Sequence, residues 1–226
     1  MAGFSSNGLC ITYVTDPDLS PGRQLDVLTE FVRSAPNQAL RVAFRMPSAS
    51  DDQVESLLNA YLLAIERAGV TSLLLPPLIH NRPMLVARYP GCGLWLSTQW
   101  LAEIHVADAY SVHSLDEATD AFDAGARELV FGHVFASESH PGKPGRGIAA
   151  LQHLKLMMRM DVDEPVITAI GGIDEDSIQA IGAAGIRSVA CIRAVSRSPD
   201  IAATLRGMCE IWHVGMTTYV QEGHTR

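Results

Sequence analysis

The chain has 226 residues, of which 47% are hydrophobic and 19% are charged, so its composition is that of a folded domain and not of a disordered protein. Its formal net charge of -8 argues against binding to nucleic acid or to an anionic membrane surface, because such binding needs clustered Lys and Arg. A small phosphorylated ligand is not excluded, since backbone N–H groups can bind a phosphate without net positive charge.

Short apolar segments alternate with longer amphipathic ones along the whole chain. We expect the apolar segments to be β-strands, and they cover residues 10–16, 40–45, 72–76, 93–97, 107–113, 128–133, 165–171 and 188–193. Several are nearly continuous hydrophobic runs, which is typical of parallel strands that are covered on both faces.

Two of the amphipathic segments begin with a sequence that fits a capping box. In Ser50 to Gln53 and in Ser114 to Glu117, a serine oxygen and a later Gln or Glu side chain can satisfy free amides of the first helical turn. These positions predict helix starts.

Three helix ends share one layout, a helix tail followed by Ala-Gly and then an apolar strand. Gly69, Gly125 and Gly185 stand where a helix C-cap needs a left-handed residue. The spacing between them corresponds to two βα units of roughly 30 residues each. The recurrence therefore favours a repeated βα architecture.

Eight strands in strict alternation with helices predict a single (β/α)8 TIM barrel. We expect one domain over residues 1–226, with a core of about 10–206 and a C-terminal extension over 207–226. An open doubly wound sheet is the alternative, but no GxGxxG follows the first strand. The apolar segment 208–216 could cover the barrel base or a partner subunit, so a homo-oligomer stays open.

The chain has no stretch approaching 18 apolar residues, and its N-terminus lacks the pattern of an export signal. Four cysteines are scattered without a CxxC pair, so neither a disulfide framework nor a metal site is indicated. We expect a cytoplasmic protein with no membrane partner.

In a barrel of this kind, functional residues lie at the C-terminal ends of the strands. There, Gly171 and Gly172 would let backbone amides approach an anion, and the turn Ile192-Arg193-Ala194 would complete a phosphate site. Arg193 could add a charged hydrogen bond, although it could equally pair with a nearby carboxylate.

His133 follows the sixth strand, after a glycine and before a loop rich in Gly, Pro and Ser. An imidazole can take up and return a proton near neutral pH, so we expect His133 to be a catalytic acid/base. The alternative is a structural histidine that makes one hydrogen bond at a strand end. No HExxH, HxxxH or paired carboxylates indicate a metal site at the strand ends.

Six stretches of the sequence, in order, resemble the thiamine phosphate synthase/TenI superfamily of (β/α)8 barrels. They are YVTD (13–16), HNR (80–82), SVHSLDEA (111–118), GHVF (132–135), GRG (145–147) and AIGGI (169–173), within a resemblance that runs from Tyr13 to about Arg206.

The resemblance implies one of two activities. The synthase joins a pyrimidine diphosphate to a thiazole phosphate and needs magnesium, and its pattern has Asn-Asp where Asn81-Arg82 stand here. It also has Gly-Pro and Thr-x-Thr-Lys where this chain has Gly132-His133 and then ASESH. A diphosphate leaving group without a metal or lysine would be poorly stabilised.

The motif GHVF is similar to that of the TenI-like thiazole tautomerase, whose histidine moves a proton within a thiazole phosphate carboxylate. This resemblance implies an isomerase of thiamin biosynthesis without metal or cofactor, with His133 as the acid/base and a thiazole phosphate as its small-molecule partner. It implies further ligand contacts from Arg45, Asn81, Ser111 and Gly147. Thiamine phosphate synthase and a non-catalytic protein that binds thiazole or thiamine phosphates are the alternatives.

Overall fold

A computed structural model describes residues 8–34, 39–69, 74–104, 106–159 and 164–221 of the chain. The strands are β1 (Cys10–Val14), β2 (Ala39–Phe44), β3 (Leu78–His80), β4 (Gly93–Ser97), β5 (Ala109–Val112), β6 (Glu128–Gly132), β7 (Val166–Ile170) and β8 (Ser188–Cys191). The helices are α1 (Pro21–Arg33), α2 (Asp51–Ala68), α3 (Pro83–Val86), α4 (Leu115–Asp123), α5 (Gly147–Met157), α6 (Ile178–Ala183), α7 (Arg193–Ser196) and α8 (Ile201–Gln221), with a 3-10 turn, η1 (Thr98–Trp100).

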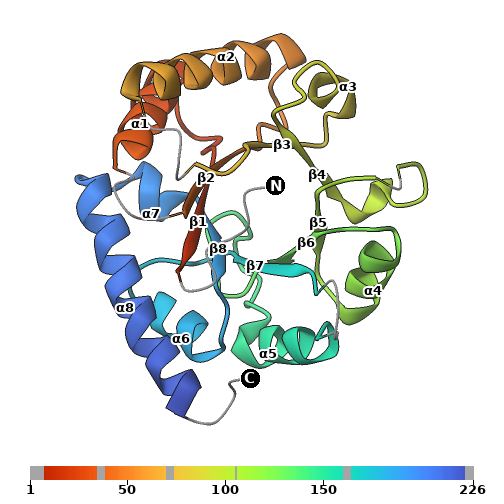
Figure 1. Cartoon of the computed structure of the whole chain (residues 1–226). Helices are drawn as coiled ribbons and strands as arrows, with labels where there is room; N and C mark the ends of the chain where they lie inside the picture. The colour runs from red at the N-terminus through yellow and green to blue at the C-terminus, as the bar shows by residue number, and fades with distance from the viewer. Residues whose placement is uncertain (1–7, 35–38, 70–73, 105, 160–163, 222–226) are drawn as a thin grey trace.

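The strands form a closed parallel barrel in the order β1 to β8, and β8 pairs with β1 (Figure 1). Figure 1 looks into the barrel and shows the helices as an outer ring around it. The (β/α)8 prediction is therefore confirmed, and the open doubly wound sheet is excluded, because β1 has a partner on each side.

Seven of the predicted strands overlap observed ones, but the third was placed wrongly. Within the described part of 72–76, Leu74 makes only an isolated bridge with Leu40, and β3 begins at Leu78. Pro76 and Pro77 explain the shift, because proline has no N–H to donate to a strand ladder. Residues 72 and 73 lie outside the described ranges.

The helix caps follow their sequence signals in most cases. Ser50 and Gln53 form the complete capping box at the start of α2. Ser114 accepts a hydrogen bond from the amide of Glu117, but the Glu117 side chain bonds the amide of His113, so the second box is only half formed. The predicted left-handed C-caps are confirmed by φ values of 64°, 90° and 71° at Gly69, Gly125 and Gly185.

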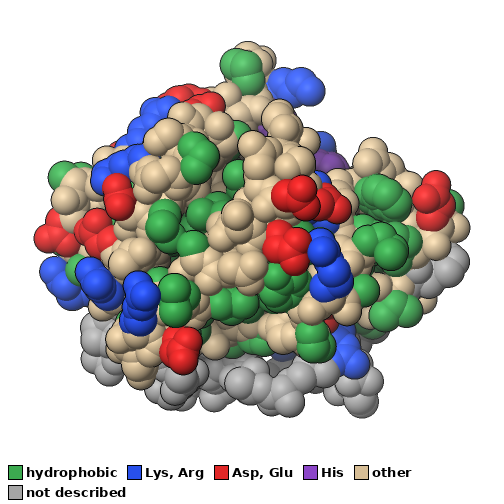
Figure 2. All heavy atoms as spheres, turned by 90° about the horizontal axis from the view of Figure 1, so that it is seen from above, with side chains coloured by type: hydrophobic (Ala, Val, Ile, Leu, Met, Phe, Trp, Pro, Cys, Tyr) green, Lys and Arg blue, Asp and Glu red, His purple; other side chains and the backbone are tan. Residues whose placement is uncertain are grey.

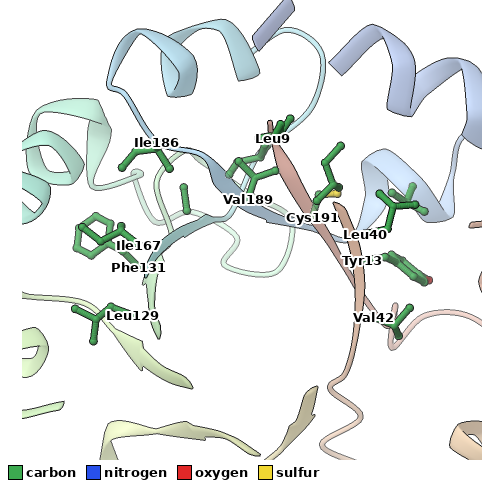
Figure 3. Packing of buried hydrophobic residues seen from close by; sticks show 14 of the residues in the cluster. Leu9, Tyr13, Leu40, Val42, Leu129, Phe131, Ile167, Ile186, Val189 and Cys191 are labelled. Carbon is green, nitrogen blue, oxygen red and sulfur yellow. The ribbon is translucent and has the colours of Figure 1, made fainter. Parts of the chain in front are cut away.

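The main hydrophobic core lies between the barrel and the ring of helices. Figure 3 shows part of it, with side chains such as Leu129, Phe131 and Ile167 on the outer side of their strands. A second, smaller cluster includes Val14 and Trp95, which alternate in sequence with the outward-facing residues of the same strands. This second cluster fills the barrel interior below its mouth.

A buried polar layer lies at the N-terminal ends of the strands. Arg41 of β2 donates two hydrogen bonds to Glu128 of β6, and one to Thr12 of β1. The Thr168 hydroxyl donates to the Glu128 carboxylate at 2.5 Å and accepts a hydrogen bond from the Ser188 hydroxyl at 2.7 Å. Burial by itself lowers the pKa of Arg41, but the adjacent Glu128 carboxylate outweighs it and raises that pKa. Arg41 therefore stays charged in the barrel interior.

The C-terminal helix α8 covers the barrel beside α6 (Figure 1). A Cβ added at Gly182 would lie 2.3 Å from the carbonyl oxygen of Trp212, so the two helices pack at close range. The Trp212 indole also donates a 2.8 Å hydrogen bond to the carbonyl of Ile186. The apolar side of the segment 208–216 is thus covered by this chain itself.

Figure 2 shows the side of the molecule that α2 covers, and acidic and basic side chains are interspersed there. Within the described ranges, no helix has the length and apolar character needed to cross a lipid bilayer.

Candidate active site

A cavity of about 310 Å³ opens at the C-terminal ends of the strands. Most of the predicted site residues line it, namely Arg45, Ser111, His133, Gly171, Gly172, Ile192, Arg193 and Ala194. These residues come from the ends of β2, β5, β6, β7 and β8, as the strand-end rule predicts for a barrel.

Asn81 and Gly147 are the two predicted site residues that are absent from the lining of this cavity. The Asn81 side chain accepts a 2.9 Å hydrogen bond from the amide of Ser97 and donates one of 3.1 Å to its hydroxyl. The amide of Gly147 donates to the carbonyl of Val134 at 2.9 Å. In this structure both residues therefore hold neighbouring loops together.

The wall of the cavity is largely apolar on the side of the barrel interior. Trp95, Val130 and Ile170 line it there. The Trp95 indole donates a 2.9 Å hydrogen bond to Ser111, and its ring meets the His80 ring edge to face at 4.7 Å. Burial, with added repulsion from Arg45 and Arg82, lowers the pKa of His80 to about 3, so this ring is neutral.

Arg45 is a half-buried cation at the rim of the cavity. Its backbone pairs with the Thr15 side chain, which fixes the end of β2. Within the described part of the chain its guanidinium makes no hydrogen bond or ion pair, and burial lowers its pKa. A half-buried guanidinium without a counter-ion is well suited to an anionic ligand.

Arg193, by contrast, is held by two carboxylates. It contacts Asp18 at 2.7 Å and Glu138 at 3.3 Å, and it donates to the Ser139 hydroxyl at 3.0 Å. Arg197 binds both oxygens of Glu138 at 2.8 and 2.9 Å. These contacts tie the loop after β6 to α7 and lower the pKa of Glu138, chiefly through the hydrogen bonds from Arg197.

The sequence analysis did not predict these ion pairs, in which Glu138 and Asp18 bind Arg193 and Arg197; we call them the clamp. It left Glu138 without a role, and it gave no role to Asp18 or Arg197. No local signal identifies these three residues, because the clamp joins segments that are remote in the chain. Only the pairing of Arg193 with a carboxylate was among the alternatives considered, and the structure shows that pairing.

His133 lines the cavity and is covered by the loop that follows it. Its ring stacks on that of His140, with centroids 4.4 Å apart and planes 11° apart. Its Nε2 lies 3.0 Å from the carbonyl oxygen of Pro144, which can only accept, so Nε2 carries a hydrogen. The Nδ1 of His140 and the hydroxyl of Ser137 are buried without a partner among the described residues.

The double glycine brings the loops after β6 and β7 together. Gly171 and Gly172 have φ values of 100° and 65°. A Cβ on Gly171 would lie 2.4 Å from the Cβ of His133, and one on Gly172 would lie 2.4 Å from the carbonyl oxygen of Ala136. Any side chain at either position would therefore displace the loop that carries His133 and His140.

The residues present do not fit a resident magnesium ion. Arg82 pairs with Asp51 and donates to the carbonyls of Met46 and Ala49, while Asn81 is bound to Ser97. Among the described residues, no three His, Cys, Asp or Glu side chains are grouped so that they could hold a metal. The mouth thus offers cations and backbone amides to an anion, and no carboxylate cluster to a metal.

The family model described as thiamine monophosphate synthase, TMP-TENI, matches residues 102–195. This segment runs from the approach to β5 to α7 and includes the β6, β7 and β8 sides of the cavity.

Curated relatives support the same family. A thiamine-phosphate synthase of Methanoregula boonei is 39% identical over 101 residues, which cover 44% of this chain and 44% of that protein. One of Marinobacter nauticus is 27% identical over 189 residues, which cover 79% of each chain. The first of these matches thus spans less than half of the relative's own length.

A solved structure, thiamine phosphate pyrophosphorylase from Pyrococcus furiosus, superposes with a TM-score of 0.71 at 18% identity, over 92% of this chain and 97% of that one. At this identity the likeness supports the fold alone.

The prediction of a thiazole tautomerase was wrong. The relatives are named thiamine-phosphate synthases, which are transferases, and none of these findings points to an isomerase. In the structure, the Nε2–H of His133 donates to the carbonyl of Pro144, and one face of its ring is stacked on His140. A histidine at a strand end did not by itself specify the reaction.

The order of motifs along the chain, the closed barrel and the family match over 102–195 agree with one another. Over residues 102–195 the chain is similar to the thiamine monophosphate synthase family, TMP-TENI, and its curated relatives carry the name thiamine-phosphate synthase.

Proposed function

We propose that this protein is a transferase of the thiamine phosphate synthase type, which joins a pyrimidine diphosphate to a thiazole phosphate at the barrel mouth. The observation that carries the proposal is the cavity that pairs the free Arg45 guanidinium with an apolar wall. Most of its lining belongs to the segment that matches the family.

The reaction sets three demands on the site. The thiazole nitrogen forms a bond to the exocyclic carbon of the pyrimidine, the bond from that carbon to the diphosphate oxygen breaks, and diphosphate leaves with the electron pair. The site must therefore stabilise a departing anion, hold the thiazole phosphate in place and keep water from the reactive carbon.

The residues of the cavity can be assigned to these demands. Arg45 is the cation for the diphosphate, because no group of the described ranges neutralises it. Backbone amides at Gly171 and Gly172 and in the turn 192–194 are assigned to the thiazole phosphate. Trp95 and Ile170 form an apolar wall against which the heterocycles can pack.

The coupling assay tests the proposal directly. Purified protein is incubated with the pyrimidine diphosphate and the thiazole phosphate, and thiamine phosphate and inorganic pyrophosphate are both quantified. We expect the two products in equal amounts, and we expect Arg45→Met to lose most of the turnover. The matched control is Arg23→Met, since Arg23 is an exposed arginine of α1.

A non-catalytic protein that binds the same phosphates is the second candidate. The lack of a carboxylate for magnesium at Asn81-Arg82 and the clamped Arg193 favour it. Saturable binding of thiazole phosphate without any pyrophosphate release would support this candidate and contradict the transferase. We place either activity in the cytoplasm, where the free cysteines of the described chain would stay reduced.

A further inference from the structure

We propose that the stacked imidazoles of His133 and His140 form an anion contact that takes up a proton when a diphosphate group enters the mouth. This inference deepens the proposed function and rests on its assignment of an anionic ligand to the cavity. It adds a contact that the motifs did not predict, and it makes a change in protonation part of binding.

The geometry of the pair leaves one nitrogen available for a ligand. His133 uses its Nε2–H on the Pro144 carbonyl at 3.0 Å, which fixes the orientation of its ring. His140 stacks on this ring at 4.4 Å, and both side chains line the cavity. The Nδ1 of His140 is buried without a hydrogen-bond partner among the described residues.

A buried polar atom without a partner costs free energy, and proteins rarely keep one without a purpose. The same lining includes the hydroxyl of Ser137, which is also buried without a hydrogen-bond partner in the described chain. Both atoms can donate a hydrogen bond once His140 carries a proton. An acceptor-rich anion would satisfy them together.

Burial and the neighbouring cations both disfavour the charged form of His140 before a ligand binds. Burial lowers its pKa, and His133, Lys143, Arg45 and His113 lower it further because each is a potential or actual cation. Glu138 lines the same cavity, but its carboxylate is already bound by Arg193 and Arg197. Asp174, the other carboxylate of the described lining, accepts a 3.1 Å hydrogen bond from the amide of Ser177. The net effect of the surroundings is to lower the pKa of His140.

An incoming diphosphate reverses this balance. Its negative charge favours the imidazolium of His140, so the imidazole gains a proton as the anion binds. The bound state then holds more protons than the free state, and affinity must fall as pH rises through the pKa of the complex. For one proton the limiting change is about ten-fold in Kd per pH unit.

Calorimetric titration with inorganic pyrophosphate tests the inference. The heat of binding is measured at one pH in two buffers that differ in ionisation enthalpy, and the difference gives the protons taken up. We expect His140→Gln to take up fewer protons than the native protein and to lose the pH dependence of Kd. His140→Lys, whose charge is permanent in this range, is expected to bind tightly with little pH dependence.

The control is His213→Gln, since His213 is exposed on α8 and lies outside the cavity. It should match the native protein, and its use corrects for protons that pyrophosphate itself exchanges. If His140→Gln kept the native proton uptake and pH slope, or if pyrophosphate did not bind, the inference would be overturned. Proton-linked binding without thiamine phosphate formation would instead contradict the proposed function and leave this inference standing.

Discussion

The charged side chains at the two ends of the barrel interior differ in whether they have hydrogen-bonding and ion-pair partners. At the N-terminal end, Arg41 and Glu128 are buried, paired with each other and bonded to neighbouring hydroxyls. At the mouth, Arg45 has no counter-ion within the described chain and His140 keeps an unpartnered nitrogen. The first arrangement is complete without a ligand, and the second is not. The pairing of charged side chains therefore distinguishes the N-terminal end of the barrel from the end that we propose to bind the ligand.

The largest effect, on the free energy of unfolding, is expected from breaking the buried ion pair at the N-terminal end of the barrel. Glu128→Ala would leave the Arg41 guanidinium buried without its partner, which costs about 3–5 kcal/mol of unfolding free energy. Urea denaturation followed by circular dichroism measures the loss. Replacing both residues, Arg41→Met with Glu128→Leu, should restore much of the stability. A single variant as stable as the native protein would show that the pair is not essential to the interior.

The second-largest effect is expected at the mouth, where a substitution should weaken ligand binding and leave stability nearly unchanged. Arg45→Met should leave the unfolding free energy within about 0.5 kcal/mol of the native value, because a half-buried cation without a partner loses no ion pair. Its Kd for inorganic pyrophosphate should rise about ten-fold or more through loss of a charged hydrogen bond. An unchanged Kd would remove Arg45 from the site.

The smallest effect is expected at the clamp between the loop after β6 and α7. Glu138→Gln removes the ion pairs with Arg193 and Arg197, so limited proteolysis within 136–145 should become a few-fold faster. The lowered pKa of Glu138 sets the pH dependence of the clamp. The clamp is fully present above the ordinary value of 4.5, and it is lost as pH falls through the lowered pKa. Cleavage at pH 7 that is as slow in Glu138→Gln as in the native protein would show that these ion pairs do not hold the loop.

The sequence predicted the barrel because its signals are local. Hydrophobic runs marked the strands, and Ala-Gly marked three helix ends whose φ values are positive. Strand ends then identified His133, Gly171, Gly172 and the turn 192–194, all of which line the cavity, without knowledge of any contact. The prediction of the third strand was wrong because it considered only the apolar residues of SLLLP. The prolines at 76 and 77 determine where strand pairing can start.

Contacts between remote segments were beyond the reach of the sequence. Arg41 lies in an apolar run and Glu128 opens another, and only closure of the barrel brings them together across 87 positions. The same holds for Arg193 and Asp18. The tautomerase interpretation failed for a related reason, since it relied on one histidine whose hydrogen bond and stacking partner were not visible.

The most direct test of this contrast is an NMR titration of isotopically labelled protein with inorganic pyrophosphate. The account predicts shifts for the Arg45 Nε–H and for the amides of Gly171, Gly172 and Ala194, with no shift for Thr168 or the Arg41 Nε–H at the other end. Shifts confined to surface residues outside the cavity, or equal shifts at both ends, would contradict it.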